Sequence, residues 1–374
     1  MVTAARPLVL PGTPRRRAAA VRHLGPNWYA SVMGTAIVAT AGAGLPGAAQ
    51  PPGLRAAFAA VWALSLALLV LLLGARALHW IHHRDQARAH LLDPAMAPFH
   101  GCLAMALLAV GGGAVVVGRD WIGPGPAVVL DTVLFTAGSA AGLAVAVVVP
   151  YLMVARHRIE ADQAGPVWLL CLVAPMVSAA QGPLLVPHLP PGQGRETLLL
   201  GCLAMSGLSL LATLVMLPLI LARLITRGPL PLAQTPTLFL VLGPLGQSVT
   251  AAGALAGAAP GVVPPPYARG FEVLALLYGV PVLGFALLWL ALAGALTVRA
   301  GRRGMGFTMT WWAFTFPVGT CVTGAEALAR RTGLTGLDAL ATGLYALLVA
   351  AWAVAASRTG RGVVSGELLA APRR

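Results

Sequence analysis

The chain of 374 residues contains ten apolar segments that are long enough to cross a lipid bilayer, and this feature limits its fold more than any other. A membrane-spanning helix needs about 20 largely apolar residues. In hydrocarbon the backbone must also satisfy its hydrogen bonds within the segment, as an α-helix does. The sequence therefore predicts an all-α integral membrane protein with ten transmembrane helices, at 27–44, 56–78, 99–117, 126–154, 166–187, 197–222, 235–257, 271–297, 308–329 and 336–357.

Arginine is distributed unequally over the two sides of this ten-helix arrangement. Nineteen of the 25 arginines lie in the N-terminal tail, in the C-terminal tail or in the connections that follow the even-numbered segments. Arginine in short loops is retained on the cytoplasmic face of the membrane. We therefore expect a protein of the plasma (inner) membrane with a cytoplasmic tail over 1–26, a ten-helix transmembrane domain over 27–357 and a second cytoplasmic tail over 358–374.

The composition argues against several other classes of function. The chain is only 10% charged, whereas about a quarter of the residues of a soluble domain are charged. The arginines are spread over short loops, so we expect contact with anionic lipid headgroups and no binding of nucleic acid. The four cysteines have no C-x-x-C spacing and the His-rich stretch at 79–90 is typical of a solvated loop, so we expect no disulfide, metal site or cofactor.

The odd-numbered segments differ from the even-numbered ones in a way that recurs along the chain. They are shorter and are interrupted by glycine or proline, whereas the even-numbered segments are long and continuously apolar. The interruptions recur about every 70 residues, which indicates a repeat architecture. We expect five helical hairpins with quasi-five-fold symmetry, and we place the helix kinks at Gly34, Gly112, Pro175, Pro244 and Pro317.

Kinked helices belong inside such a protein, because an interruption leaves backbone groups that hydrocarbon cannot satisfy. We therefore expect the odd-numbered helices to pack together through small residues and the even-numbered helices to face lipid. Five inner helices around one axis would enclose a narrow central pore. The alternative is that the glycines only allow close packing and that no pore exists.

The polar side chains of the odd-numbered segments are uncharged, and those we expect to line the pore are Asn27, Ser31, Thr35, Ser178, Gln247, Ser248 and Thr320. Such a lining, behind an arginine-rich cytoplasmic mouth, suits small anions. Each side chain has an alternative role in a hydrogen bond between helices. Of the rare carboxylates, Glu326 has the spacing for an ion pair with Arg330, and Asp131 lies near a segment start, where a helix N-terminus favours negative charge.

An aromatic run at 311–317 (WWAFTFP) is the most unusual local feature. The two tryptophans at its start are typical of the membrane interface. Phe316 precedes Pro317 in the middle of the segment, where a large ring can either point along the pore axis and block it or pack against a neighbouring helix. The pattern alone leaves both roles open.

Two stretches of the chain resemble signatures of a known family. Residues 25–38 (GPNWYASVMGTAIV) are similar to the first-helix signature of the tellurite-resistance/dicarboxylate transporter family, and residues 311–317 resemble its ninth-helix signature. The superfamily includes slow anion channels of plant guard cells, yeast malate permeases and sulfite efflux pumps. The resemblance covers about residues 22–357, and it departs from the usual first-helix signature at Ala36, where the family has glycine.

The resemblance implies five hairpins around a central pore, with the odd-numbered helices inside, and a homotrimer in which each subunit has its own pore. It also implies that a phenylalanine of the ninth helix occludes the pore. By motif position this is Phe316, and Phe314 is the alternative if the alignment shifts by two residues. The tails are short compared with the phosphorylated tails of the plant channels, so we expect no control by kinases.

Together these features predict a membrane transporter, not an enzyme, that passes small anions through a pore occluded by a phenylalanine. The expected substrates are C4-dicarboxylates such as malate, sulfite, chloride and nitrate. The alternative on the same fold is a proton-coupled carrier for dicarboxylate, sulfite or tellurite-type oxyanions, with Glu326 as the coupling acid. A membrane enzyme or haem subunit is disfavoured, because the segments contain no facing histidine pair and the chain has no D-x-x-x-D motif.

Overall fold

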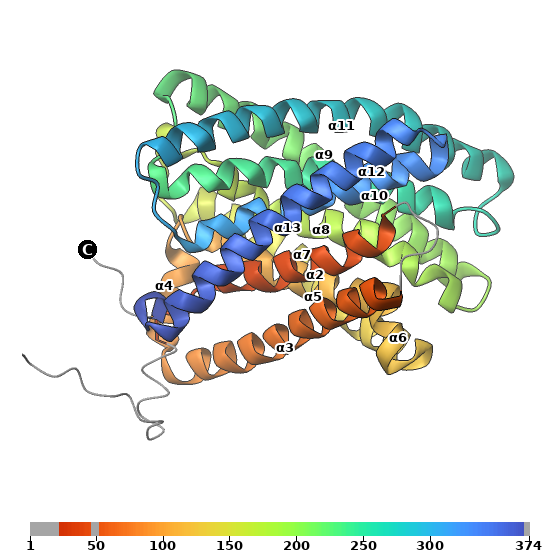
Figure 1. Cartoon of the computed structure of the whole chain (residues 1–374), viewed down its shortest axis with the longest axis horizontal. Helices are drawn as coiled ribbons and strands as arrows, with labels where there is room; N and C mark the ends of the chain where they lie inside the picture. Colours follow the sequence, from red (N-terminus) through yellow and green to blue (C-terminus); the bar gives the residue numbers. More distant parts are fainter. Residues whose placement is uncertain (1–21, 46–51, 370–374) are drawn as a thin grey trace, which may run out of the picture.

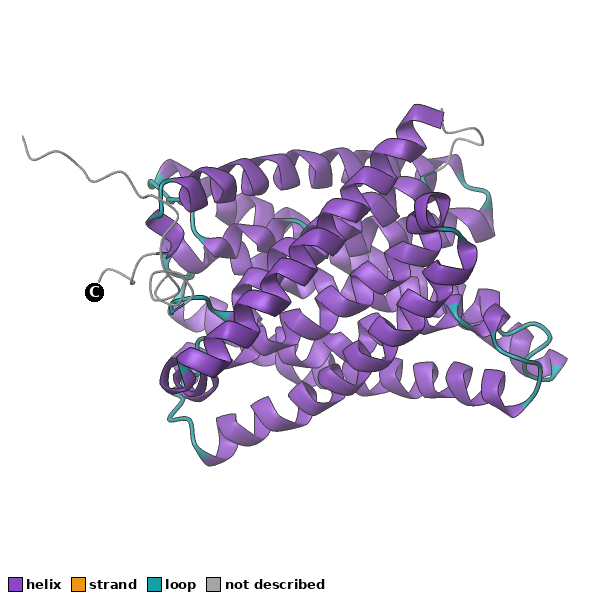
Figure 2. Ribbon diagram, turned by 90° about the horizontal axis from the view of Figure 1, so that it is seen from below, coloured by secondary structure: helices purple, strands orange, loops and turns teal. Residues whose placement is uncertain are grey.

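The computed structural model describes residues 22–45 and 52–369, and over these residues it consists of helices and loops without β-strands (Figure 2). Eight of the described helices are long and apolar enough to cross a membrane. The all-helical prediction is confirmed for this part of the chain, and the long helices are those of an integral membrane protein. The tail arginines that entered the topology prediction lie partly outside the described residues, namely Arg6, Arg15, Arg16, Arg17, Arg373 and Arg374.

Five long helices form the outside of the bundle: α3 (Pro52–His82), α7 (Pro124–Ala155), α9 (Gln193–Arg227), α11 (Pro265–Arg302) and α13 (Thr335–Val364). Only 17–33% of the residues in their apolar windows are buried. Their exposed side chains include large apolar ones such as Leu71, Val147 and Leu277. A surface of this kind needs hydrocarbon or another protein against it, which fits the lipid-facing position expected of the even-numbered segments.

Five shorter helices lie inside: α2 (Tyr29–Gly44), α5 (Gly101–Gly113), α8 (Leu170–Gln181), α10 (Leu242–Ala258) and α12 (Phe316–Thr332). The apolar windows around α5, α8 and α10 are 78–89% buried, and 13 of the 16 residues of α2 and 13 of the 17 residues of α12 are buried. The interior position predicted for the odd-numbered segments is confirmed. Each inner helix packs against the next in chain order, and α12 packs against α2, which closes a ring.

The number of long apolar helices differs from the predicted ten. The segments 27–44 and 308–329 form α2 and α12, which have only 16 and 17 residues. A 3-10 helix precedes each of them, η1 (Pro26–Trp28) before α2 and η9 (Met309–Phe314) before α12. The ten-helix, five-fold arrangement therefore stays a prediction.

Every inner α-helix begins directly after a 3-10 helix or one residue beyond it. The other three 3-10 helices are η2 (Ala97–His100), η5 (Pro166–Leu169) and η8 (Leu232–Val241). Proline suits the first turn of a helix, because its φ angle is fixed and its missing N–H is not needed there. Four of the five 3-10 helices contain a proline, at positions about 70 residues apart: Pro26, Pro98, Pro166 and Pro236.

The predicted kink prolines fall at different places within the inner helices. Pro175 lies inside α8. Pro244 and Pro317 instead lie in the first turns of α10 and α12, where a proline removes no helical hydrogen bond. The sequence analysis predicted kinks in the middle of these two helices. The structure instead has a change from 3-10 to α winding at or just before the start of each helix.

The predicted kink glycines allow helices to approach each other. The α-helix α2 runs without a change of type through Gly34, and a Cβ atom there would collide with side-chain atoms of Thr315 and Trp312. Gly112 lies one residue before the end of α5, ahead of a π-helical turn at Ala114–Gly118, and a Cβ atom there would collide with Gln181. Close packing is thus the role that the structure gives to both glycines.

The last hairpin of the chain packs against the first. In Figure 1, α13 (blue) crosses beside α2 (red), although the two helices are at opposite ends of the sequence. Trp352 Nε1 of α13 donates a hydrogen bond to Thr35 Oγ1 at 3.1 Å, and the Tyr345 hydroxyl donates to the carbonyl of Val38 at 3.1 Å. These bonds hold the outer helix α13 against the inner ring.

The end of the bundle at which the inner helices begin is called here the arginine-rich end, because the connections after the even-numbered segments lie there. At this end the short helix α4 (Arg84–Leu92) packs against α3, and the rings of His79 and His90 stack with centroids 5.6 Å apart. The stretch is helical and His79 is fully buried, so the expected loop is wrong for these features, whereas His82, Arg84 and Arg88 are exposed as expected. Burial, with the nearby charges of Arg76, His79 and His100, lowers the pKa of His90 from 6.5 to about 4.

We expect Gly246→Ala to destabilise the ring and Gly243→Ala, one turn earlier in α10, to be tolerated. A Cβ atom at Gly246 would lie 2.6 Å from backbone atoms of Thr320 and Cys321, whereas one at Gly243 would meet no described heavy atom within 4 Å. Overpacking of this kind costs about 1–3 kcal/mol. Thermal unfolding in detergent would measure the difference, and equal stability of the two variants would contradict this account of α10–α12 packing.

Acidification is expected to destabilise the protein through His90. Its folded-state pKa lies below the unfolded value, so the unfolded chain binds more protons between these two values. The stability associated with neutral His90 is present above about pH 6.5 and is lost as the pH falls toward about 4. We expect His90→Gln to flatten the pH dependence of the unfolding temperature over this window, and the exposed His188→Gln to leave it as in the wild type. A profile that His90→Gln does not change would contradict the assignment.

Candidate functional site

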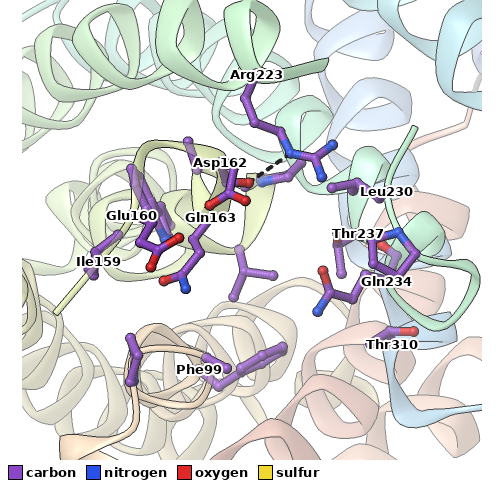
Figure 3. Close-up of a pocket in the computed structure, with 18 residues that line it drawn as sticks. Phe99, Ile159, Glu160, Asp162, Gln163, Arg223, Leu230, Gln234, Thr237 and Thr310 are labelled. Carbon is purple, nitrogen blue, oxygen red and sulfur yellow. Dashed lines mark hydrogen bonds between the residues drawn. The ribbon is translucent and has the colours of Figure 1, made fainter. Parts of the chain in front are cut away.

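A cavity of about 520 Å³ lies among the loops of the arginine-rich end (Figure 3). Its walls come from the connections that lead into η2, η5 and η8, together with the end of α9 and the start of η9. The cavity therefore lies where the polypeptide enters the inner helices. The lining residues used below are Phe99, Glu160, Asp162, Gln163, Trp168, Arg223, Gln234, Thr237 and Thr310.

A second, much smaller void of about 10 Å³ adjoins the cavity, because Phe99, Thr237 and Thr310 line both. A volume of this size holds about one water molecule. Every inner segment contributes to its wall, and Thr237 and Thr310 carry its only hydroxyl groups. The lining residues, in chain order, are Ala30, Met33, Phe99, Cys102, Leu170, Thr237, Leu240, Met309, Thr310 and Ala313. We call this void the constriction, because it is far narrower than the cavity that it adjoins.

The constriction lies at the starts of the five inner α-helices. Cys102 and Leu170 are in the first turns of α5 and α8, and Leu240 and Ala313 lie two and three residues before α10 and α12. None of the five helix starts has a side-chain cap. The N–H groups at the starts of α2, α5, α8 and α10 bond to carbonyls of the preceding 3-10 helices, so the positive ends of these helix dipoles lie at the starts of the 3-10 helices.

Within the inner ring there is open space beside α10, and several uncharged polar side chains are only half-buried. Gly243 of α10 is buried, yet a Cβ atom there would meet no described heavy atom within 4 Å, so open space lies beside it. Farther along the ring, the hydroxyls of Thr250 and Thr323 are half-buried and bond to each other at 2.7 Å between α10 and α12. Gln181 of α8 is also half-buried.

Several of the side chains predicted to line a pore bond to outer helices instead. Thr35 accepts a hydrogen bond from Trp352 of α13 at 3.1 Å. Ser178 accepts one from Ser139 of α7 at 2.9 Å, and Ser248 accepts one from Tyr278 of α11 at 2.7 Å. Their hydroxyl hydrogens are donated to carbonyls of their own helices. Helix–helix bonding, the alternative stated for these residues, is therefore the role that the contacts support.

The remaining predicted polar residues are less uniform. Thr320 is fully buried and its hydroxyl lies 3.2 Å from the carbonyl of Leu242 in α10, and Ser31 donates to the carbonyl of Trp28 at 2.7 Å. Gln247 is buried, with an Oε1 atom that has no partner among the described residues. Asn27 is half-buried in η1.

The two candidate gate residues have different surroundings. Phe314 is half-buried and packs edge-on against Phe239 and Trp311, with ring centroids 4.8 and 5.7 Å away. Phe316 is the first residue of α12 and only 3% exposed. Phe314 is thus held in an aromatic cluster. Ala36, the departure from the family signature, is fully buried in α2.

Two carboxylates are buried in the bundle. The predicted ion pair of Glu326 is confirmed, with Oε2 3.7 Å from Nη1 of Arg330, but Oε1 has no partner among the described residues. Asp131 lies seven residues beyond the start of α7, so the expected support from a helix N-terminus is wrong. Both of its carboxylate oxygens are buried and lack a partner within the described ranges.

Sequence reasoning missed the residues of the cavity and the constriction. Arg223 is the single arginine that lines the cavity, and two carboxylates, Glu160 and Asp162, line it too. The arginine-rich mouth expected from the sequence is therefore of mixed charge at the cavity. Thr237 and Thr310 precede the α-helices by several residues, and the recurring prolines before the helices are the signal that would have directed attention to these stretches.

This arrangement is that of a multi-pass membrane protein with short buried helices inside, long apolar helices outside, and a cavity at the end where the inner helices begin. The chain belongs to the voltage-dependent anion channel family (SLAC1), whose family model matches residues 23–360. It is 27% identical to an uncharacterized transporter of Methanocaldococcus jannaschii over 93% of this chain and 96% of that protein. It is also 26% identical to sulfite efflux pumps of Trichophyton rubrum and Arthroderma otae, over 89% of each chain. The family and these relatives are channels or transporters, and the chain is an anion transporter of this family.

We expect Asp131→Asn to preserve or raise the stability of the protein, and Asp131→Lys to abolish folding. An ionised carboxylate without a partner is costly to bury, and the amide has the same shape without the charge. A lysine at this position would also bury a charge, and it is larger than aspartate. The space is tight, because a Cβ atom built on Gly111 would lie only 2.7 Å from the Asp131 carboxylate. Thermal unfolding above neutral pH would measure this, and a loss of more than about 2 kcal/mol in Asp131→Asn would mean that the carboxylate has a bonding partner.

Proposed function

We propose that the protein conducts small anions across the plasma (inner) membrane through a path that starts at the cavity and passes the constriction. The observation that carries this proposal is the constriction, to which all five inner segments contribute uncharged side chains close to where each passes from a 3-10 helix to an α-helix. Because these side chains are uncharged, an anion is not bound too tightly to leave. Membership in the voltage-dependent anion channel family supports the same function.

The full topology is part of the proposal. In it α2 and α12 also cross the membrane, which makes ten transmembrane helices in five hairpins with quasi-five-fold symmetry over 27–357. Both tails, 1–26 and 358–374, are cytoplasmic, so the cavity opens to the cytoplasm. The exposed apolar faces of the outer helices contact lipid or the neighbouring subunits of a homotrimer, the assembly implied by the family resemblance.

Sulfite is the first substrate to test, because two relatives are named sulfite efflux pumps. Malate, chloride and nitrate follow from the resemblance to the wider superfamily. All are small anions that a weakly polar constriction can pass after partial loss of water.

Phe316 is the proposed gate. It lies directly after the break between η9 and α12 and next to the constriction in sequence, since Ala313 lines that void. Phe314 is less suited to move, because two aromatic rings pack against it. A buried ring at the start of an inner helix narrows the path until it rotates aside.

We expect Phe316→Ala to raise anion flux by about tenfold or more, which corresponds to about 1.4 kcal/mol off the barrier. Phe314→Ala, two residues earlier, is the matched control and is expected to change flux much less. The measurement is the current through purified protein in planar bilayers, with chloride, nitrate, sulfite and malate compared under asymmetric conditions. Unchanged current in a folded Phe316→Ala protein would remove the gating role, and a larger increase in Phe314→Ala would transfer it to that residue.

A proton-coupled carrier is the second candidate, and the buried Glu326 in α12 favours it. Its unpartnered Oε1 atom can take up a proton as the path changes conformation. In proteoliposomes this version predicts that sulfite or malate uptake acidifies the lumen and that Glu326→Gln uncouples uptake from the pH gradient. Uptake that neither moves protons nor responds to a pH gradient would exclude it.

A further inference from the structure

Arg223 is held in the wall of the cavity by two backbone carbonyls. Its Nε atom donates to the carbonyl of Asp162 at 3.0 Å, the dashed line in Figure 3, and its Nη1 atom donates to the carbonyl of Gly228 at 2.7 Å. Gly228 ends α9 with a φ angle of 75°, a conformation that favours glycine. The local fold thus fixes the guanidinium in place with neutral acceptors, which leave its charge uncancelled.

The carboxylates of the same cavity do not neutralise Arg223. Glu160 and Asp162 both line the cavity, and arginine readily forms strong paired hydrogen bonds with carboxylates. Among the described residues, however, the ion pairs within 4.0 Å are Arg22–Asp85, Arg55–Asp120 and Arg330–Glu326, and none includes Arg223. Arg223 bonds to the backbone carbonyl of Asp162 and not to its carboxylate. The cavity therefore contains a guanidinium and carboxylates that form no ion pair with each other.

Two amide side chains complete the polar wall. Gln163 and Gln234 come from opposite sides of the cavity in Figure 3, and no hydrogen bond within the described part of the chain occupies their side-chain amides. An amide offers two donors and one acceptor, a guanidinium offers only donors, and an ionised carboxylate offers only acceptors. A ligand complementary to Arg223, the two amides and the Asp162 carboxylate carries one negative charge, several acceptor oxygens and one O–H donor, while the exposed side chain of Glu160 stays solvated.

We propose that the cavity is a binding site for a singly protonated, singly charged oxyanion, such as hydrogen sulfite or a hydrogen dicarboxylate. Arg223, with Gln163 and Gln234, holds the anionic oxygens, and the Asp162 carboxylate accepts the remaining O–H. A fully ionised dianion has no such donor and is repelled by Asp162 and Glu160. This inference rests on the proposed anion path, for which it names the form of substrate that is selected before the constriction.

The test measures binding to the full-length protein in detergent through the fluorescence of Trp168, which lines the cavity. Its signal is isolated as the difference between the wild type and Trp168→Phe. The probes are nitrate, which has no O–H donor, and sulfite at about one pH unit below and one above its second pKa. If only the protonated form binds, the apparent affinity for sulfite falls by about tenfold at the higher pH, while the affinity for nitrate stays constant.

Three variants separate the roles. Arg223→Gln is expected to weaken binding of both probes by about tenfold or more, because a charge-assisted bond is lost. Arg227→Gln removes a charge one turn away on α9, outside the cavity wall, and is expected to bind as the wild type does. Asp162→Asn keeps the carbonyl that anchors Arg223 and is expected to lower the preference for hydrogen sulfite over nitrate by about fivefold or more.

Two results would overturn the inference: wild-type affinities in a folded Arg223→Gln protein, or an unchanged preference in Asp162→Asn. If Arg223→Gln does not fold, the Asp162→Asn result alone tests the inference, because that variant keeps the backbone carbonyl to which Arg223 bonds. Measuring anion flux in proteoliposomes distinguishes a failure of this inference from a failure of the proposed function. Saturable binding without flux would contradict the proposed path, whereas flux without saturable binding at Trp168 would contradict this site.

Discussion

The structure depends on one feature of the backbone: its winding changes from 3-10 to α at or next to the start of every inner helix, and these inner helices are largely buried within the bundle. The five inner helices lie together, and five long continuous α-helices cover them, of which α7, α9 and α11 each contain an internal proline. Because the 3-10 helices all precede the α-helices, the changes gather at one level of the bundle. The constriction lies close to that level, so the feature that distinguishes the inner helices also marks the narrowest part of the proposed path.

Charge is distributed so that the proposed path stays nearly neutral. Glu326 is tied to Arg330, and Asp131 is on an outer helix against α5. Hydroxyls such as Thr35, Ser178 and Ser248 bind the outer helices to the ring and leave the interior to small and apolar side chains. The free cation Arg223 lies in the cavity before the constriction. In this proposal the anion is selected by specific contacts in the cavity, and it then passes the constriction with only weak contacts.

The sequence was sufficient for the fold class and for the sorting of helices, because both follow from hydropathy and from the periodic interruptions. It failed where packing decides. Gly34 allows α2 to approach Thr315, and Pro244 and Pro317 begin helices, so a mid-helix kink was the wrong interpretation of a local signal. Polar residues on an inner segment do not reveal which neighbour they face, as Ser178 and Ser248 illustrate. The cavity residues Asp162 and Arg223 are far apart in sequence, and only folding brings them together.

The central claim is that water and anions reach the interior of the inner ring, and accessibility to a thiol reagent tests it most directly. In a protein whose four cysteines are replaced by alanine, a cysteine at Gly243 lies beside the internal space, and one at Leu211 lies on the exposed apolar face of α9. With an anionic methanethiosulfonate reagent applied to membranes, the account predicts that Gly243→Cys reacts and that excess sulfite slows the reaction, while Leu211→Cys stays unmodified in lipid. Modification of Leu211→Cys with no reaction at Gly243→Cys would contradict it.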